Sequence, residues 1–190
     1  MKKELRAEAL KQRDEMPLAE RNEKSRQITA HILQSEVYQK AKRIFTFVSM
    51  GSEVETRGIM SQAWNDGKAV AVPKTEKGRV MYFLPIQSFA DLQKGRFGVM
   101  EPSGSEEDAI VPERGDLFLV PGALFDEKMN RLGYGGGYYD TYFENYQGYG
   151  KIGLAFQSQV RSEPILAEKT DIPLDDIVTE NGWMGGRKHE

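Results

Sequence analysis

The sequence predicts an α/β protein in which helices flank a layered, mostly parallel sheet. Short runs of β-branched and aromatic residues alternate along the chain with stretches whose apolar residues recur at helical spacing. The order strand, helix, strand within residues 43–72 is typical of a parallel crossover unit. With 190 residues, the chain suits one compact domain and is short for two, so we expect a single domain over residues 1–190.

Two helices are expected before the first strand. Apolar residues at helical spacing predict a helix over residues 2–16, which Pro17 ends, and a second helix over residues 18–38. His31 lies beside the apolar stripe of the second helix. Packing or solvent exposure is a more common role for such a histidine than ligand binding, so we do not expect a ligand there.

The remaining elements alternate between strands and helices. Residues 43–49 (RIFTFVS) are rich in the residues that favour a buried strand. We expect further strands over residues 69–72, 80–84, 116–120, 151–156 and 177–178, and further helices over residues 56–64 and 138–146. Residues 88–113 are dominated by Gly, Pro, Ser and charged residues, which predicts a loop with short irregular pieces. A loop of this length in a compact domain is usually functional.

Composition excludes several classes of function. The net charge of −3 argues against a nucleic-acid binder held mainly by phosphate contacts. The absence of cysteine excludes disulfides, thiolate metal sites and a cysteine nucleophile. With only two histidines, a catalytic metal would need carboxylates or phosphates as ligands. No apolar run suggests a signal peptide or a membrane span, so we expect a cytoplasmic protein with no membrane partner and no obligatory protein partner.

The glycine-rich stretch over residues 131–140 (RLGYGGGYYD) has the clearest chemical signal. Its four glycines allow positive φ angles and a close approach of backbone N–H groups to a ligand, as in phosphate cradles. A helix that begins near Tyr138 would add its positive N-terminal end. Arg131 can bind phosphate oxygens in a bidentate manner, and Asp140 supplies a hard oxygen for Mg²⁺. The stretch therefore predicts a site for a nucleotide with Mg²⁺.

A structural role for the same stretch is the alternative. Neither the P-loop pattern nor the G-x-G-x-x-G pattern is present, so the glycines also fit a turn that only joins a strand to a helix, with Tyr138 and Tyr139 packed in the core. Lys2, Lys3 and Arg6 lie where a helix face could clamp a polyphosphate, although charged N-terminal helices are often simply solvated.

The combination of Val120-Pro-Gly, Phe125-Asp126 and residues 131–140 resembles the signature of the 5-formyltetrahydrofolate cyclo-ligases, also called methenyltetrahydrofolate synthetases. The resemblance extends over nearly the whole chain, including residues 47–56 and 72–74. It implies a ligase that converts 5-formyltetrahydrofolate to 5,10-methenyltetrahydrofolate with ATP and Mg²⁺, through phosphorylation of the formyl oxygen and ring closure. It also implies a layered α/β sheet that resembles the phosphosugar isomerase-like fold.

The resemblance implies roles for three sets of residues. The expected ATP contacts are Lys2, Lys3, Arg6, Arg131, Leu132, Gly133, Tyr134, Gly135, Gly136, Gly137, Tyr138 and Tyr139, of which Arg131 and Tyr139 are the expected catalytic residues. The expected folate contacts are Val48, Glu53, Phe97 and Tyr138. The expected metal ligands are Asp140 and Asp171.

The glycine-rich stretch departs from the family pattern at two positions. Gly136 stands where the family often has a lysine, and Tyr134 stands where a basic residue is common. A cation for the terminal phosphate must then come from Arg131, the N-terminal helix, Lys74 or Mg²⁺, and the sequence does not select one of them. Lys74 and Arg96 are also candidates for binding a glutamate tail of the folate.

Two other functions remain open from the residues alone. A non-catalytic nucleotide sensor would use the same glycine-rich stretch without a second substrate pocket. A phosphosugar isomerase would need a well-placed general base and no ATP. The sequence does not predict the oligomeric state or the preferred polyglutamate length.

Overall fold

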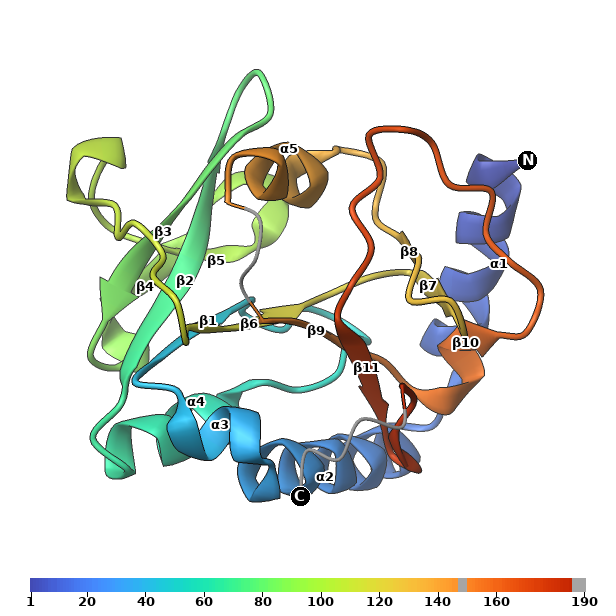
Figure 1. Ribbon diagram of the computed structural model, residues 1–190, viewed down its shortest axis with the longest axis horizontal. Coiled ribbons are helices and arrows are strands. Elements are labelled where there is room, and N and C mark those ends of the chain that lie inside the picture. Colours follow the sequence, from blue (N-terminus) through green and yellow to red (C-terminus); the bar gives the residue numbers. More distant parts are fainter. Residues whose placement is uncertain (147–149, 186–190) are drawn as a thin grey trace.

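The computed structural model describes residues 1–146 and 150–185, and its centre is a seven-stranded sheet (Figure 1). The strand order is β12–β11–β9–β6–β1–β2–β3. These strands are β1 (Arg43–Thr46), β2 (Ala69–Glu76), β3 (Val80–Ile86), β6 (Leu117–Val120), β9 (Gly150–Leu154), β11 (Asp176–Thr179) and β12 (Gly182–Trp183). Each inner pairing is parallel, and only the edge strands β3 and β12 pair antiparallel. The predicted mixed α/β architecture with a mostly parallel sheet is confirmed.

Helices cover both faces of this sheet (Figure 1). The helices α2 (Leu18–Gln34), α3 (Glu36–Lys40) and α4 (Arg57–Asn65) lie on one face, and α5 (Tyr138–Asn145) lies on the other. Successive side chains of a strand point to opposite faces. Accordingly, Ile44 and Leu117 join the apolar cluster under α2, whereas their neighbours Phe45 and Phe118 join the cluster under α5. The uninterrupted apolar runs in the sequence follow from burial on both faces.

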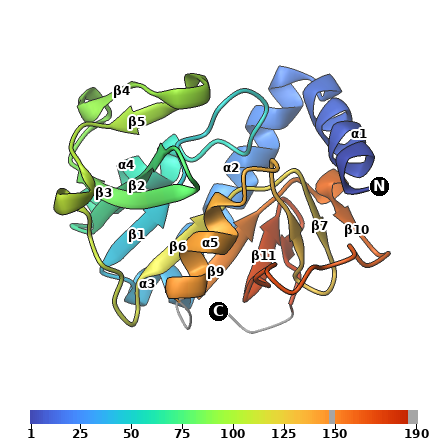
Figure 2. The ribbon, with the colours of Figure 1, turned by 90° about the horizontal axis from the view of Figure 1, so that it is seen from above.

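A second, smaller sheet lies beside the first and supports the N-terminal helix. It contains β7 (Leu124–Asp126), β8 (Arg131–Leu132) and β10 (Val160–Arg161) in the order β10–β7–β8. The helix α1 (Lys2–Glu15) packs here, through an apolar cluster that includes Ala9, Leu124 and Leu132. In Figure 2, α1, β7 and β10 lie on one side of the molecule, β2 and β3 lie on the other, and α5 lies between them.

The structure contains the short strands β7, β8, β10 and β12, which were not predicted, and it differs from the predicted elements at several places. The helix expected over residues 18–38 is broken at Ser35, whose backbone is extended and whose hydroxyl accepts a hydrogen bond from Tyr38 N at the start of α3. The segment expected to be a loop over residues 88–113 contains a hairpin of β4 (Leu92–Lys94) and β5 (Met100–Pro102). It also contains three short 3₁₀ turns, at Phe89–Asp91, Arg96–Gly98 and Glu106–Asp108, and a further 3₁₀ turn lies at Gln157–Gln159. The expected strand over residues 69–72 continues to Glu76.

The predictions for the two histidines and for membrane spans can also be compared with the structure. His31 makes a hydrogen bond with the carbonyl of Glu180, which fits the expected packing role. His189 lies outside the described residues. Within the part of the chain that the structure describes, no helix is both long enough and apolar enough to span a membrane. The loops that follow β1 and β6 leave the same edge of the parallel sheet, which is where such sheets usually bind ligands.

Candidate active site

The glycine loop, defined as residues 131–137, connects β8 with α5. Gly135 and Gly137 have φ angles of +100° and +70°, in the region that only glycine enters without strain. Gly137 is the N-terminal cap residue of α5, so the first free N–H groups of this helix lie directly after the loop. The backbone conformation therefore explains why glycine stands at these two positions, and without side chains their N–H groups can approach a ligand closely.

Arg131 and Asp140 close the two ends of this loop against each other. The Nη2 atom of Arg131 lies 3.4 Å from Oδ2 of Asp140, and Nη1 donates to the carbonyl of Pro121 at 3.2 Å. The guanidinium also lies over the ring of Tyr139, 5.3 Å from its centre. The side chain of Arg131 is only 5% exposed, whereas that of Asp140 is 24% exposed. Arg131 thus stabilises the loop from its buried side, and part of the Asp140 carboxylate remains accessible to a ligand.

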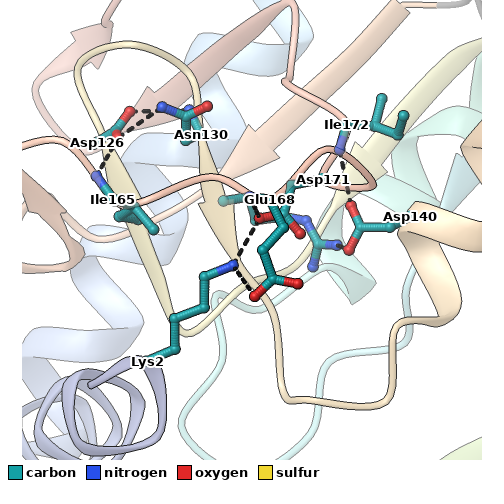
Figure 3. Close-up of polar contacts among 9 residues, drawn as sticks. Lys2, Asp126, Asn130, Asp140, Ile165, Glu168, Asp171 and Ile172 are labelled. Carbon is teal, nitrogen blue, oxygen red and sulfur yellow. Dashed lines mark hydrogen bonds and ion pairs between the residues drawn. The ribbon is translucent and has the colours of Figure 1, made fainter.

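A second carboxylate lies beside Asp140, in the segment before β11 (Figure 3). Asp171 pairs with Nζ of Lys2 at 2.8 Å, and Lys2 also pairs with Glu168 at 2.9 Å. The next residue, Ile172, donates its N–H to Oδ1 of Asp140 at 3.1 Å, which joins the two carboxylates in one region. Burial by itself would raise the pKa of Asp171, but the hydrogen bonds from Lys2 and from Glu168 N outweigh it and hold that pKa below its usual value.

These carboxylates suit a metal that takes most of its oxygen ligands from elsewhere. In residues 1–146 and 150–185 there is no cluster of three or more His, Cys, Asp or Glu side chains that could hold a metal ion. Mg²⁺ commonly uses one or two carboxylates together with substrate phosphates and water. Asp140 and Asp171 fit that donor set.

The helix α1 reaches the glycine loop through two arginines. Arg6 donates from Nε to the carbonyl of Gly133 at 2.6 Å. Arg13 is buried, and it donates to Ser52 Oγ at 2.9 Å, to the Tyr134 hydroxyl at 2.8 Å and to the carbonyl of Gly122 at 3.3 Å. Sequence reasoning missed Arg13. Its spacing of two helical turns from Arg6 puts both arginines on one face of α1, and this was the available signal.

Glu53 joins this network from the loop after β1. Its carboxylate accepts hydrogen bonds from the Tyr134 hydroxyl at 2.7 Å and from Met50 N at 2.8 Å. Burial raises the pKa of Glu53, and these two hydrogen bonds only partly oppose the effect. Burial and the nearby Glu53 carboxylate raise the pKa of Tyr134, so its hydroxyl stays protonated and donates. Through Tyr134, the glycine loop is bonded to the loop that contains Glu53.

Several of the predicted site residues do not join these contacts through their side chains. Phe97 is 70% exposed in the β4–β5 hairpin, where it contacts the guanidinium of Arg96. Val48 and Leu132 are buried in apolar clusters. Among the described residues, Lys3 is exposed and makes no hydrogen bond or ion pair.

Lys74 and two tyrosines of α5 complete the set of predicted residues. Lys74 donates to the carbonyl of Gly104 at 2.6 Å, away from the glycine loop. Tyr138 donates its hydroxyl to the carbonyl of Glu76, at the end of β2. Burial raises the pKa of Tyr139, whose ring packs under Arg131.

The chain is similar to known proteins over nearly its full length. The model of the 5-formyltetrahydrofolate cyclo-ligase family matches residues 1–180. A 5-formyltetrahydrofolate cyclo-ligase of Haemophilus influenzae is 29% identical over 93% of this chain and 96% of its own length. The protein of the same name from Mus musculus is 30% identical over 95% and 94%, respectively.

Solved structures agree with this similarity. The structure of 5,10-methenyltetrahydrofolate synthetase from Aquifex aeolicus has a TM-score of 0.80 and 31% identity, and it covers 96% of this chain and 91% of that one. The Mycoplasma pneumoniae synthetase, at 22% identity, supports the fold alone, with a TM-score of 0.73 over 94% of this chain and 98% of that one. From the family model and these relatives together, the chain belongs to the 5-formyltetrahydrofolate cyclo-ligase family.

Proposed function

We propose that this chain converts 5-formyltetrahydrofolate to 5,10-methenyltetrahydrofolate in a reaction that uses ATP and Mg²⁺ and releases ADP and phosphate. As a member of the cyclo-ligase family it is a ligase. The observation that carries the proposal is the bond between the glycine loop and the Glu53 loop through Tyr134, because it joins a phosphate-type loop to a second substrate region. A nucleotide sensor would have no use for that connection.

In this proposal the triphosphate of ATP lies along the glycine loop. Backbone N–H groups of residues 133–139 and the N-terminal end of α5 bind phosphate oxygens. Arg131 supplies positive charge from the buried side of the loop, where its guanidinium pairs with Asp140 and donates to the carbonyl of Pro121. Lys2, Lys3 and Arg6 approach from α1, and Arg6 is already bonded to the loop at Gly133. Tyr139, packed against Arg131, keeps the guanidinium oriented.

Asp140 and Asp171 would hold Mg²⁺, and when bound this ion would neutralise charge on the transferring phosphate. Lys2 pairs with Asp171, so a metal at this carboxylate requires Lys2 to turn toward the phosphates. The residual exposure of Asp140 supports its role as the primary ligand.

The folate would lie on the side of the Glu53 loop. Glu53 is an acceptor for the N–H groups of the pterin ring, and the Tyr134 and Met50 hydrogen bonds orient its carboxylate. The backbone around Val48, the ring of Tyr138 and the exposed ring of Phe97 are the other proposed contacts. Phe97 contributes only if the β4–β5 hairpin moves toward the substrate.

The chemistry needs positioning and charge stabilisation and no protein nucleophile. The formyl oxygen of 5-formyltetrahydrofolate is a poor leaving group, so ring closure by the neighbouring amine is slow. Attack of that oxygen on the γ-phosphate releases ADP and forms an imidate-type phosphate. The amine then closes the five-membered ring and phosphate leaves. The loop N–H groups and Arg131 would stabilise the charge that develops on the transferring group.

Several broader expectations belong to the same proposal. We propose that residues 1–190 act as a single cytoplasmic domain with no nucleic-acid, membrane or obligatory protein partner. We also propose that the fold is similar to that of the phosphosugar isomerases. An isomerase would work without ATP, so the requirement for ATP separates the two activities.

The test is the absorbance of the methenyl product formed from 5-formyltetrahydrofolate, with ATP and Mg²⁺ each omitted in turn. We expect product only when both are present. Product without ATP would contradict the mechanism, and ATP binding without any folate-dependent turnover would favour the sensor.

A further inference from the structure

The glycine loop contains no cation that is free to meet a phosphate. Between Arg131 and Asp140 the sequence has no lysine or arginine. Arg131 itself is nearly buried and paired, and Lys2 is paired with Asp171 and Glu168. Lys74 donates to the carbonyl of Gly104, away from the loop. Arg6 of α1 donates to the carbonyl of Gly133 and lies against Gly135, before the start of α5. A triphosphate that extends to Gly137 and the N-terminal end of α5 therefore needs a cation from another segment.

The turn between β2 and β3 supplies one. Arg79 lies in this turn, and a β-carbon built on Gly137 would lie 3.5 Å from both Cζ and Nε of Arg79. Its guanidinium thus packs on the glycine that caps α5. Arg79 is an exposed residue and, within the described ranges, it makes no hydrogen bond or ion pair. The N–H groups of its guanidinium are available to a ligand.

The backbone of Arg79 is a second, independent observation. Its φ is +63°, next to Gly78 at +83°. Glycine adopts this conformation freely, whereas a residue with a β-carbon does so at a cost. Strained residues that persist in a fold gather at binding sites, where the side chain has a use that offsets the strain. A glycine at position 79 would suit the turn at least as well, so the turn itself does not require the arginine.

Contacts between the β2–β3 turn and the glycine loop explain why Arg79 lies beside the loop. The Tyr138 hydroxyl donates to the carbonyl of Glu76, the last residue of β2. A β-carbon on Gly136 would lie 2.7 Å from the Tyr138 ring, so the ring fills the space that a side chain at position 136 would need. The same tyrosine therefore occupies the space of a side chain at position 136 and ties the loop to the turn that presents Arg79.

We propose that Arg79 binds phosphate oxygens of the ATP triphosphate at the N-terminal end of α5, in place of a cation within the glycine loop. This inference rests on the proposed function. A guanidinium beside the free N–H groups of a helix start makes a planar, bidentate donor set for a phosphate.

The test compares ATP binding by the full-length wild type with three variants, using calorimetry and thermal unfolding. Arg79→Gly removes the cation and the backbone strain together. We expect its Kd for ATP to rise about tenfold or more, as for loss of a charge-assisted hydrogen bond, while its Tm stays equal or increases. The opposite directions of binding and stability distinguish a ligand contact from a structural role.

Two further variants complete the design. Arg79→Lys keeps a cation, so its Kd should lie between those of the wild type and Arg79→Gly. Lys77→Ala removes an exposed cation from the same turn and should bind ATP like the wild type. The Kd of Arg79→Gly should also depend less steeply on salt.

The two proposals fail in different ways. If the wild type binds ATP and Arg79→Gly binds it equally well, the role of Arg79 is wrong and the proposed function stands. An equal loss in Lys77→Ala would also overturn the role of Arg79, since any charge in the turn would then serve. If the wild type binds no ATP, the proposed function and the role of Arg79 both fall.

Discussion

The β7–β8 hairpin and the first turn of α5 each contain an aspartate, and the two carboxylates are bonded very differently (Figure 3). Asp126 is fully buried and accepts four hydrogen bonds, from the backbone of Lys128, Asn130 and Ile165 and from the Asn130 side chain. Asp140 is a quarter exposed and has one backbone donor, Ile172 N, and the long Arg131 contact.

This difference separates a carboxylate that holds the fold from one that can bind a ligand. The lone pairs of Asp126 are used within the protein, so a metal there would first have to break the hairpin. Asp140 has unused accepting capacity and reaches solvent. Both residues lie in the matching signature, so the signature alone could not separate their roles.

Asp126→Ala should produce the largest loss of stability. It leaves buried N–H groups of the hairpin and of Ile165 without an acceptor, and we expect about 3–5 kcal/mol of destabilisation. Urea unfolding of the variant beside Asp140→Ala measures the contrast. The latter loses one backbone hydrogen bond and a long contact with the nearly buried Arg131, so it should be destabilised by about 1–2 kcal/mol. Equal losses in both variants would remove the distinction between the two carboxylates.

Asp140→Asn should have the largest effect on turnover and a small effect on the fold. Losing a metal ligand should lower kcat about 100-fold or more, and the Tm should change little. The measurement is product formation over a range of Mg²⁺ concentrations. Glu144→Gln, an exposed residue of the same helix, is the control and should match the wild type. A wild-type response to Mg²⁺ in Asp140→Asn would contradict its assignment as a ligand.

The Glu53 carboxylate is intermediate between Asp126 and Asp140, since it accepts hydrogen bonds from two donors and has a raised pKa. Glu53→Gln should raise the KM for 5-formyltetrahydrofolate about tenfold, because the amide cannot accept both N–H bonds of a pterin equally well. The kcat with saturating folate should fall less. An unchanged KM would mean that Glu53 only supports the loop.

The same variant should also show a pH-dependent change in stability. Since folding raises the pKa of Glu53, the protonated form is favoured in the folded protein. The resulting contribution to the free energy of unfolding is fully present below the pKa of Glu53 in the unfolded chain, about 4.3. It is lost as pH rises through the pKa of Glu53 in the folded protein. The Tm of Glu53→Gln relative to wild type should therefore increase as pH rises from about 4 through the folded pKa of Glu53. A constant difference would mean that the pKa is not raised.

The smallest effect is expected at the Lys2–Asp171 pair. Both side chains are partly exposed, so Lys2→Gln should cost about 0.5–1 kcal/mol at neutral pH. The pKa of Asp171 is lowered in the folded protein, so this stabilisation is present above about pH 4 and is lost as pH falls through the folded value. Thermal unfolding at several pH values tests this. A gap between wild type and Lys2→Gln that widens in acid would contradict it.

Most of the central sheet could be predicted because its signal is local. The runs around Ile44 and Leu117 are buried on both faces of the sheet, and their composition shows it. The strands β7, β8 and β10 have only two or three residues each, and partners distant in sequence hold them, so no periodicity could develop. The break at Ser35 depends on a single hydroxyl that caps α3 within an otherwise continuous helical pattern.

The candidate site divides in the same way. The proximity of Arg131 and Asp140 could be expected from the sequence because both residues flank one short pattern. The role of Arg79 could not, and the sequence signal for Arg13 was only its spacing from Arg6 on one face of α1. Ser52 and Tyr134, the hydrogen-bond partners of Arg13, lie in loops distant from it in sequence. The importance of Arg79 depends on the packing of one turn against the glycine loop, which no local pattern encodes.

The distance along the chain between the bonded groups has a consequence for folding. The hydrogen bond between Lys2 and Asp171 joins residues 169 positions apart, and those from Arg6 and Arg13 to the 122–134 segment cross more than a hundred positions each. Because closing long loops costs entropy, we expect such contacts to form late in folding. The nucleotide site would then be complete only in the folded protein. A bound nucleotide should therefore lower the unfolding rate and leave the folding rate unchanged.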